Sequence, residues 1–335
     1  MPKRKPSTPT RISKHKRKRS PQKHAVRIIQ AIYRLARSDK LLDAKAIDPT
    51  RDMLRSALRN RDTGLIYDWL AGVFSLQGIS DRVAIEFARK NGAASWNNVS
   101  ADLVRKPTCP KLSSFWHYEG CGYSKTLRTC ARPDHFRTCP VPTMRLRNGR
   151  LNITSWALAL FIRDIVEGDL VRWLGKRIRI ERHRRQNIQD DRDRLLVPLN
   201  GIYGVSDKVL SMALADLLLA APVRWRGWNR LGGTLVAIDS LVHANLARTG
   251  ILARYKAEHA YGPACYQPRG CADIIDRIAF RLKAPPRAVQ HAIWRYCAQD
   301  GLNICNGNRI DDWRKCKNIH CRLYRICDRK RLHVA

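Results

Sequence analysis

The chain has 335 residues, 44% of them hydrophobic, which suffices for a large core in one large or two ordinary domains and argues against wholesale disorder. Lys and Arg number 64 against 28 acidic residues, a net charge of +36. Neutralising phosphates with basic side chains releases counterions, so this excess favours a nucleic-acid partner over an acidic lipid surface or an acidic protein. No apolar run reaches the roughly 18 residues of a membrane span, so we expect no membrane association.

In chain order, residues 1–23 contain ten basic and no acidic residues without hydrophobic periodicity, which predicts a disordered basic tail. From 24 to 335 the pattern predicts an all-α body, because no strand-like alternation of any length occurs. A charged stretch, 181–195, is expected to be a solvated helix face or connection, and 222–233 a loop carrying Trp225 and Trp228. Helical spacing of apolar residues covers 24–37, 51–59, 65–76, 150–180, 209–220, 234–252, 272–282 and 289–296.

A segment with two glycines, 199–208 (LNGIYGVSDK), precedes the apolar helix predicted over 209–220. A helix, a tight turn and a second helix present backbone N–H groups that receive a phosphate irrespective of base sequence. Further on, Asp239 lies between Ile238 and Leu241, where an acidic residue is costly unless it caps a helix or takes part in chemistry. The residues alone favour the capping role and leave the chemical role open.

Segment 199–208 resembles the Leu-Pro-Gly-Val-Gly-x-Lys hairpin of the endonuclease III and adenine-glycosylase superfamily, the helix-hairpin-helix DNA glycosylases. Asp239 falls where that family has its catalytic aspartate, and Arg248-Thr249 also agrees. Residues 74–81 (FSLQGISD) resemble the family's Leu-Leu-Ser-Ala-Gln-x-x-Asp, and 120–125 (GCGYSK) its Gly-Leu-Tyr-Asn-Ser-Lys. The matches occur in the family's order. They place core motifs at 74–130 and 196–255, with an insertion at 131–195.

The resemblance implies a two-lobed helical base-excision DNA repair glycosylase, a monomer acting on double-stranded DNA in the cytoplasm at the nucleoid, or in the nucleus of a eukaryote. The target nucleotide would be flipped into a pocket. Lys208 would attack the sugar C1′, and Asp239 would stabilise the developing positive charge and assist the proton transfers. A Schiff base on Lys208 would then permit AP-lyase cleavage of the strand. The implied DNA-binding residues are Gln77, Lys125, Gly204, Val205 and Ser206.

Cysteine spacing at the C-terminus predicts a metal centre in a loop over 297–327. Cys305, Cys316, Cys321 and Cys327 give C-x10-C-x4-C-x5-C, whose last interval equals that of the family's cluster loop. The resemblance favours a [4Fe–4S] cluster, whereas four thiolates alone also suit zinc. Cys297 is an alternative first ligand to Cys305.

Two other groups of cysteines are harder to interpret. Cys109, Cys121, Cys130 and Cys139 are more widely spaced than a common metal knuckle, so a second metal site and ordinary buried thiols remain equal alternatives. Cys265 and Cys271 flank a Pro-Arg-Gly turn, and we expect them only to pair with each other or to pack.

The hairpin departs from the family pattern at two positions. Tyr203 stands where the family has Pro, and Ser206 where it has its second Gly, so the turn is strained if Ser206 must adopt a positive φ. Two alternatives follow. The chain is either a non-catalytic DNA- or RNA-binding protein that keeps the hairpin and a structural metal cluster, or a metal-cluster protein whose basic surface binds a protein partner.

Overall fold

The computed structural model describes residues 20–38, 49–75, 86, 89, 95–104, 113–118, 123–124, 129–130, 150–179, 188–202, 204–306 and 310–332. The regular secondary structure of this part of the chain is helical except for one short antiparallel pair, β1 (Tyr123–Ser124) with β2 (Thr129–Cys130), in the register Tyr123 opposite Cys130. The all-α prediction is therefore confirmed. None of the described helices is both long enough and apolar enough to cross a membrane.

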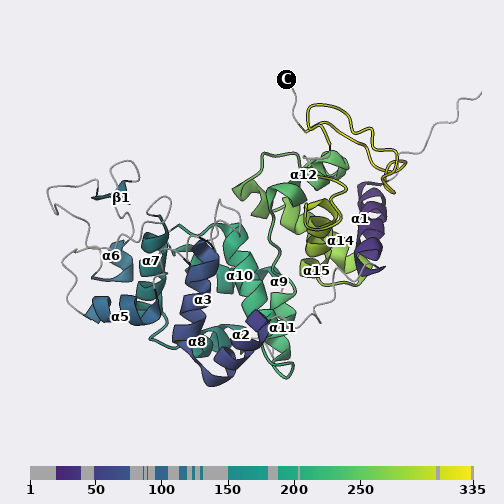
Figure 1. Ribbon diagram of the computed structural model, residues 1–335. Helices are drawn as coiled ribbons and strands as arrows, with labels where there is room; N and C mark the ends of the chain where they lie inside the picture. The colour runs from purple at the N-terminus through teal and green to yellow at the C-terminus, as the bar shows by residue number, and fades with distance from the viewer. Residues whose placement is uncertain are drawn as a thin grey trace, which may run out of the picture.

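The described helices form two lobes, each with its own apolar core (Figure 1). The first lobe contains α2 (Pro49–Asn60), α3 (Thr63–Ser75), α5 (Trp96–Val104), α6 (Phe115–Tyr118), α7 (Arg150–Asp164), α8 (Leu170–Arg179), α9 (Ile188–Asn200), α10 (Asp207–Ala220) and α11 (Arg226–Gly232). The second lobe contains α1 (Pro21–Ser38), α12 (Ser240–Arg248), α13 (Ile251–Arg254), the 3-10 turn η2 (Pro263–Tyr266), α14 (Cys271–Leu282) and α15 (Pro286–Cys297).

Apolar side chains of α7 form the centre of the first core. Its residues 156–162 are almost fully buried, and the ring of Phe161 packs edge-to-face against Phe115 and Trp173. The adjoining α9 contains Pro198, which cannot donate a hydrogen bond to the carbonyl of Arg194. The Arg177 guanidinium on α8 donates to that carbonyl instead, at 3.1 Å. This contact joins α8 to the helix that leads into the hairpin.

The chain passes from the first core to the second within two residues. Leu235 belongs to the first core and Val236 to the second, and residues 234–238 are all buried. The N-terminal α1 also packs in the second lobe, against α14 and α15, although it precedes every helix of the first lobe in sequence (Figure 1). Asp239 follows this buried crossing directly, so the fold brings it to the junction of the lobes.

Three of the predicted elements differ from the structure. The predicted helix over 150–180 is two helices, separated where Glu167 and Gly168 have φ of 55° and 79°. The predicted loop 222–233 contains α11. The ring centroids of Trp225 and Trp228 lie 4.9 Å apart, and both rings pack on the first core. The predicted helix over 234–252 begins only at Ser240. Burial on all sides, which periodicity does not reveal, explains the non-helical crossing segment.

Two further boundaries shift slightly. α1 begins at Pro21, so residues 21–23 of the predicted tail are helical. Within the predicted insertion 131–195, α7 and α8 form part of the first core, and the charged stretch continues into α9.

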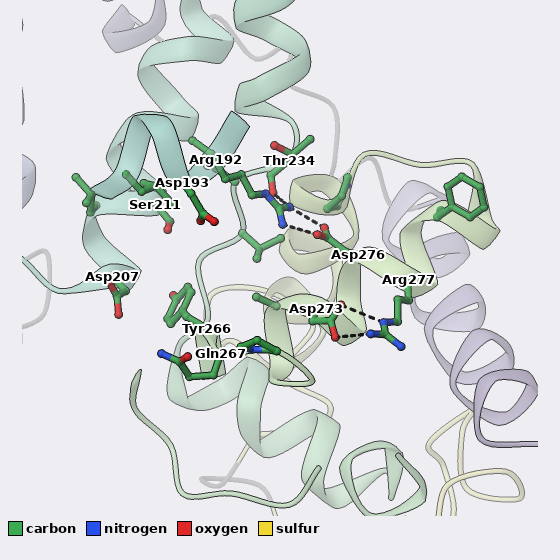
Figure 2. A pocket seen from close by; sticks show the side chains of 18 of the residues that line it. Arg192, Asp193, Asp207, Ser211, Thr234, Tyr266, Gln267, Asp273, Asp276 and Arg277 are labelled. Atoms are coloured by element: carbon green, nitrogen blue, oxygen red, sulfur yellow. Dashed lines mark hydrogen bonds and ion pairs between the residues drawn. The ribbon is translucent and has the colours of Figure 1, made fainter. Parts of the chain in front are cut away.

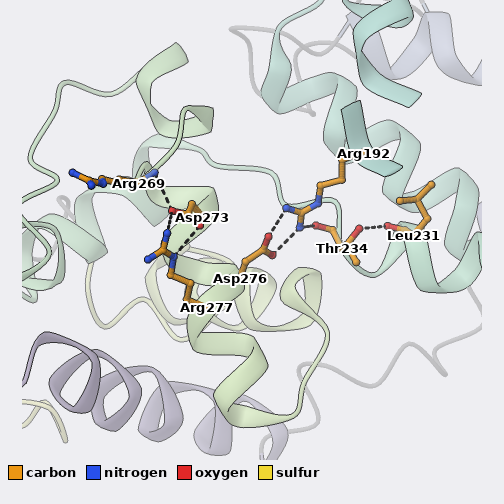
Figure 3. A network of polar contacts seen from close by, with 7 residues as sticks. All are labelled: Arg192, Leu231, Thr234, Arg269, Asp273, Asp276 and Arg277. Atoms are coloured by element: carbon orange, nitrogen blue, oxygen red, sulfur yellow. Dashed lines mark hydrogen bonds and ion pairs between the residues drawn. The ribbon is translucent and has the colours of Figure 1, made fainter. Parts of the chain in front are cut away.

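An ion pair connects the lobes beside the crossing segment (Figure 3). The Arg192 guanidinium on α9 contacts both carboxylate oxygens of Asp276 on α14, at 2.7 Å for Oδ1, and also donates to the carbonyl of Thr234. The Arg192 side chain is 7% exposed and that of Asp276 26%. Burial raises the pKa of the Asp276 carboxyl although Arg192 acts in the opposite direction, so desolvation of this pair is costly.

Candidate metal centre and hairpin site

The turn between α9 and α10 has its positive φ at Gly204 and not at Ser206. Gly204 has φ of 84°, while Ser206 is extended at φ −88° and ψ 154° and forms the N-cap of α10. A Cβ on Gly204 would lie 2.6 Å from Oγ1 of Thr154, so glycine is required by conformation and by space. The strain considered for Ser206 is therefore absent. Ile202 is buried and Val205 half-buried, whereas Gly204 and Ser206 are exposed.

Lys208 and Asp239 approach each other across the lobe junction. Lys208 is half-buried in the first turn of α10, and Asp239 is the N-cap of α12, where its Oδ1 accepts a hydrogen bond from the Val242 amide at 2.8 Å. Burial raises the pKa of the Asp239 carboxyl, and the positive charge of Lys208 opposes that shift. The capping role is thus present, and the two residues that the sequence singles out interact electrostatically.

A groove of about 1010 Å³ runs between the lobes (Figure 2). Its lining includes Asp207, the residue before Lys208, and Tyr266, whose hydroxyl accepts a hydrogen bond from the Ile238 amide at 2.8 Å. Lys208 and Asp239 themselves are not among the described residues that line it. The groove is large enough for a small molecule or a nucleobase.

Four side chains that sequence reasoning did not bring together form a compact group, which we call the His2Cys2 group. The ligand atoms of His243, His259, Cys265 and Cys271 all lie within 4.8 Å of one another, so the group could bind a metal ion. His243 lies on α12, Cys265 on η2 and Cys271 at the first residue of α14, with His259 in the loop before η2. Cys265 and Cys271, which we expected only to pair or pack, are buried without a disulfide between them, and they share this group with two histidines.

Contacts inside the His2Cys2 group are short and directed. Nδ1 of His243 lies 3.4 Å from Sγ of Cys271 and 3.5 Å from Sγ of Cys265, and Nε2 of His259 lies 3.5 Å from Sγ of Cys271. A hydrogen bond from Cys271 is the largest cause that lowers the pKa of the Cys265 thiol, while the same contact and burial raise the pKa of Cys271.

The four predicted C-terminal cysteines, Cys305, Cys316, Cys321 and Cys327, line one small and largely apolar cavity. Burial raises the pKa of the Cys327 thiol to about 12, and the other three thiols act in the same direction. Backbone amides of Leu323 and Arg329 donate to the sulfurs of Cys321 and Cys327, at 3.4 and 3.3 Å. The structure therefore brings the four predicted ligands together.

Cys297, the alternative first ligand, lies behind this cavity. It is fully buried and is absent from the described residues that line the cavity, whereas Cys305 is one of them. The amide of Asn245 is also fully buried near both thiols, and neither of its side-chain polar atoms has a hydrogen-bond partner of good geometry in the described part of the chain. A buried amide of this kind is costly unless something in the site satisfies it.

The remaining predicted site residues lie outside the described residues: Gln77, Lys125, Cys109, Cys121 and Cys139. Cys130 is described only as part of the backbone of β2. The His2Cys2 group was missed because its ligands are spaced H-x15-H-x5-C-x5-C, which lacks the short C-x2–4-C interval of common zinc motifs. The signal that could have revealed it is the presence of two histidines shortly before an isolated pair of cysteines.

Comparison with family models, curated proteins and solved structures finds no match to the chain.

Proposed function

We propose that this chain is a base-excision DNA glycosylase with AP-lyase activity that acts on double-stranded DNA. The observation that carries the proposal is the interaction of Lys208 with the buried carboxyl of Asp239 beside an exposed turn. An amine and a carboxyl in partial burial are the two groups that Schiff-base chemistry at a sugar carbon requires. The resemblance of segment 199–208 and of Asp239 to the glycosylase hairpin and its aspartate supports the same assignment.

DNA is the polyanion that best suits the rest of the chain. The net charge is +36, and Gly204 and Ser206 of the turn are exposed in front of the N-terminus of α10. A helix N-terminus attracts phosphate through its oriented peptide dipoles without reading sequence. Asp207, the residue before Lys208, lines the groove between the lobes, and a nucleotide flipped out of the duplex would enter that groove with its sugar at the side nearest Lys208.

In the proposed reaction Nζ of Lys208 attacks C1′ of the flipped nucleotide while the bond from C1′ to the base breaks. The base leaves with the bonding electron pair, and Asp239 takes up the proton that Lys208 Nζ loses. Asp239 then returns that proton to O4′ as the C1′–O4′ bond breaks and a Schiff base forms, and loss of a C2′ proton expels the 3′ phosphate by β-elimination. The raised pKa of Asp239 suits a carboxyl that accepts a proton and returns it.

Borohydride trapping on duplex DNA with an abasic site tests this proposal. Wild-type protein is expected to form a covalent complex, Lys208→Ala to form none, and Asp239→Asn to form it about 10²- to 10⁴-fold more slowly. Lys176→Ala is the matched control, because Lys176 is an exposed lysine on α8. Once trapping is established, base release from a panel of lesion-containing duplexes identifies the substrate.

Absence of trapping in the wild type, or full trapping in Lys208→Ala, would contradict the proposal. Duplex binding that weakens steeply with salt but gives no trapping would instead support the non-catalytic helix-hairpin-helix alternative. Under that alternative, the hairpin would bind phosphate and Asp239 would only cap α12, so neither would need to take part in catalysis.

We further propose that Cys305, Cys316, Cys321 and Cys327 hold a [4Fe–4S] cluster. The spacing of the C-terminal sulfurs supports this. Within the described ranges, the His2Cys2 group is the one set whose ligand atoms all lie within 4.8 Å of one another. The four C-terminal sulfurs, which line one cavity, are therefore spaced more widely than a single zinc ion needs. Amide donors to two of the sulfurs suit a group that carries its own sulfides. When bound, such a cluster can exchange one electron at a potential set by these hydrogen bonds.

Iron and acid-labile sulfide content of the purified chain, with its visible absorption, tests the cluster. The expected result is close to four irons per chain with a broad absorption at the edge of the visible range, lost in Cys316→Ser. Zinc in place of iron, with no visible absorption, would refute it. The cysteines otherwise have no role in the proposed reaction beyond organising the C-terminal loop.

A further inference from the structure

The His2Cys2 group has the geometry of a closed tetrahedral site. We propose that it binds one Zn²⁺ ion, which fastens the loop between α13 and α14 to the start of α12. Zinc–sulfur and zinc–nitrogen bonds of about 2.3 and 2.1 Å at tetrahedral angles place sulfur and nitrogen about 3.6 Å apart. Three of the four sulfur–nitrogen distances in the group are 3.4, 3.5 and 3.5 Å, and the fourth, between His259 and Cys265, is at most 4.8 Å. Packing alone has no reason to bring all three to the edge length of one tetrahedron.

The orientation of His259 is fixed in the way that ligating histidines usually require. Its Nδ1 lies 2.7 Å from the carbonyl of Ala257, so that nitrogen carries the proton and donates. Its Nε2 faces Cys271, with the sulfur 3.5 Å away. A backbone carbonyl that holds the other ring nitrogen in this way is characteristic of metal-bound histidine.

The donor set selects zinc and a structural role. Two thiolates and two neutral imidazoles together neutralise Zn²⁺, and soft thiolate ligands exclude Mg²⁺ and Ca²⁺. Cys265 and Cys271 are fully buried, so an unbound thiolate there would be costly. Because four protein ligands leave no position for water or substrate, the ion would not be catalytic.

Zinc at this position would join four segments of the second lobe at one point. The ligands come from α12, the following loop, η2 and α14. η2 is already pressed against the start of α14, since a Cβ on Gly270 would lie 2.4 Å from the carbonyl oxygen of Ala264. Tyr266, which follows the ligand Cys265 in sequence, accepts a hydrogen bond through its hydroxyl from the amide of Ile238. Ile238 is the residue directly before Asp239. The ion would therefore fix the backbone that carries Asp239.

The metal site is independent of the proposed DNA chemistry, and only its effect on catalysis through Asp239 rests on that function.

Metal analysis of the full-length chain purified under reducing conditions is the first test. We expect one zinc per chain, with X-ray absorption showing two sulfurs at about 2.3 Å and two nitrogens at about 2.0–2.1 Å. Because this measurement uses the wild type, it does not depend on any variant folding.

Variants then assign the ion to its ligands. Cys265→Ser and Cys271→Ser are expected to lose the zinc, whereas His117→Ala, an exposed histidine on α6, retains it. Cys316→Ser separates the two metal sites, because it removes a C-terminal ligand and leaves the zinc bound. Hydrogen exchange at the Ile238 amide is expected to accelerate about ten-fold or more when zinc is lost, since its acceptor Tyr266 is no longer held.

Three results would overturn the inference: a wild type that contains no zinc and takes up none, zinc retained by both cysteine variants, or a disulfide between Cys265 and Cys271 in the folded protein. None of these depends on DNA cleavage. A chain that binds zinc here but traps no DNA would refute the proposed function and leave the metal site standing.

Discussion

The ion pair between the lobes offers the sharpest test of how this fold is held together. Arg192 on α9 is 7% exposed and contacts Asp276 on α14 with two N–H groups and Thr234 with one (Figure 3). Asp276→Ala removes the carboxylate and leaves the guanidinium buried against a single carbonyl of this network. The variant changes no apolar contact in either core cluster.

The expected magnitude follows from burial. Removing one partner of a buried pair typically costs 3–5 kcal/mol, and because Asp276 is 26% exposed we expect the lower end, about 3 kcal/mol of unfolding free energy. Replacing both partners by apolar residues, Arg192→Met with Asp276→Leu, should cost much less than Asp276→Ala, since no charge is then left buried. Asp52→Ala is the control. It breaks an exposed pair with Arg55, in which Asp52 is 63% exposed, and should cost under about 1 kcal/mol.

Urea unfolding followed by circular dichroism and by tryptophan fluorescence measures these differences. If the two probes separate in Asp276→Ala but coincide in the wild type, the pair is what couples unfolding of the lobes. A cost below about 1 kcal/mol for Asp276→Ala, or a double variant less stable than the single one, would refute the reasoning that desolvation of Arg192 governs the junction.

Two further changes test local features. Gly250→Ala should lower the free energy of unfolding by about 2–4 kcal/mol, because Gly250 has φ of 79° and an added Cβ would lie 2.0 Å from Oδ2 of Asp328. Gly168→Ala is the control, since Gly168 has the same φ but open space around it, and it should cost only about 1 kcal/mol. Equal costs of the two variants in thermal unfolding would contradict the steric argument. Burial, with Arg287 and Arg295, lowers the pKa of His291 to about 4. Above its unfolded pKa of about 6.5 His291 is neutral in both states, and as pH falls toward 4 only the unfolded state gains the proton. Stability should therefore fall by about 2 kcal/mol more in the wild type than in His291→Phe between about pH 7 and pH 5, and parallel pH profiles would argue against it.

Local sequence patterns determined most helices and the pair of residues at the centre of the proposed reaction. Periodicity predicted α1, α2, α3, α10, α14 and α15 within a few residues, because each buries one face or the whole helix in a single core. Asp239 stood out locally as an acidic residue in an apolar stretch, for which the residues alone favoured a capping role, whereas Lys208 was singled out by the resemblance of segment 199–208 to the glycosylase hairpin. The four C-terminal cysteines were evident because they lie within one short loop.

The tertiary structure alone decided what lies between segments distant in sequence. α1 joins the second lobe rather than the first, and Arg192 meets Asp276 across the junction, because burial of apolar faces selects partners that no local pattern names. Residues 235–238 are buried between the two cores and are not helical, although their apolar composition equally suits a helix. The His2Cys2 group depends on folding in the same way. Its four ligands belong to four segments, so their common point exists only once α12, η2 and α14 have packed together.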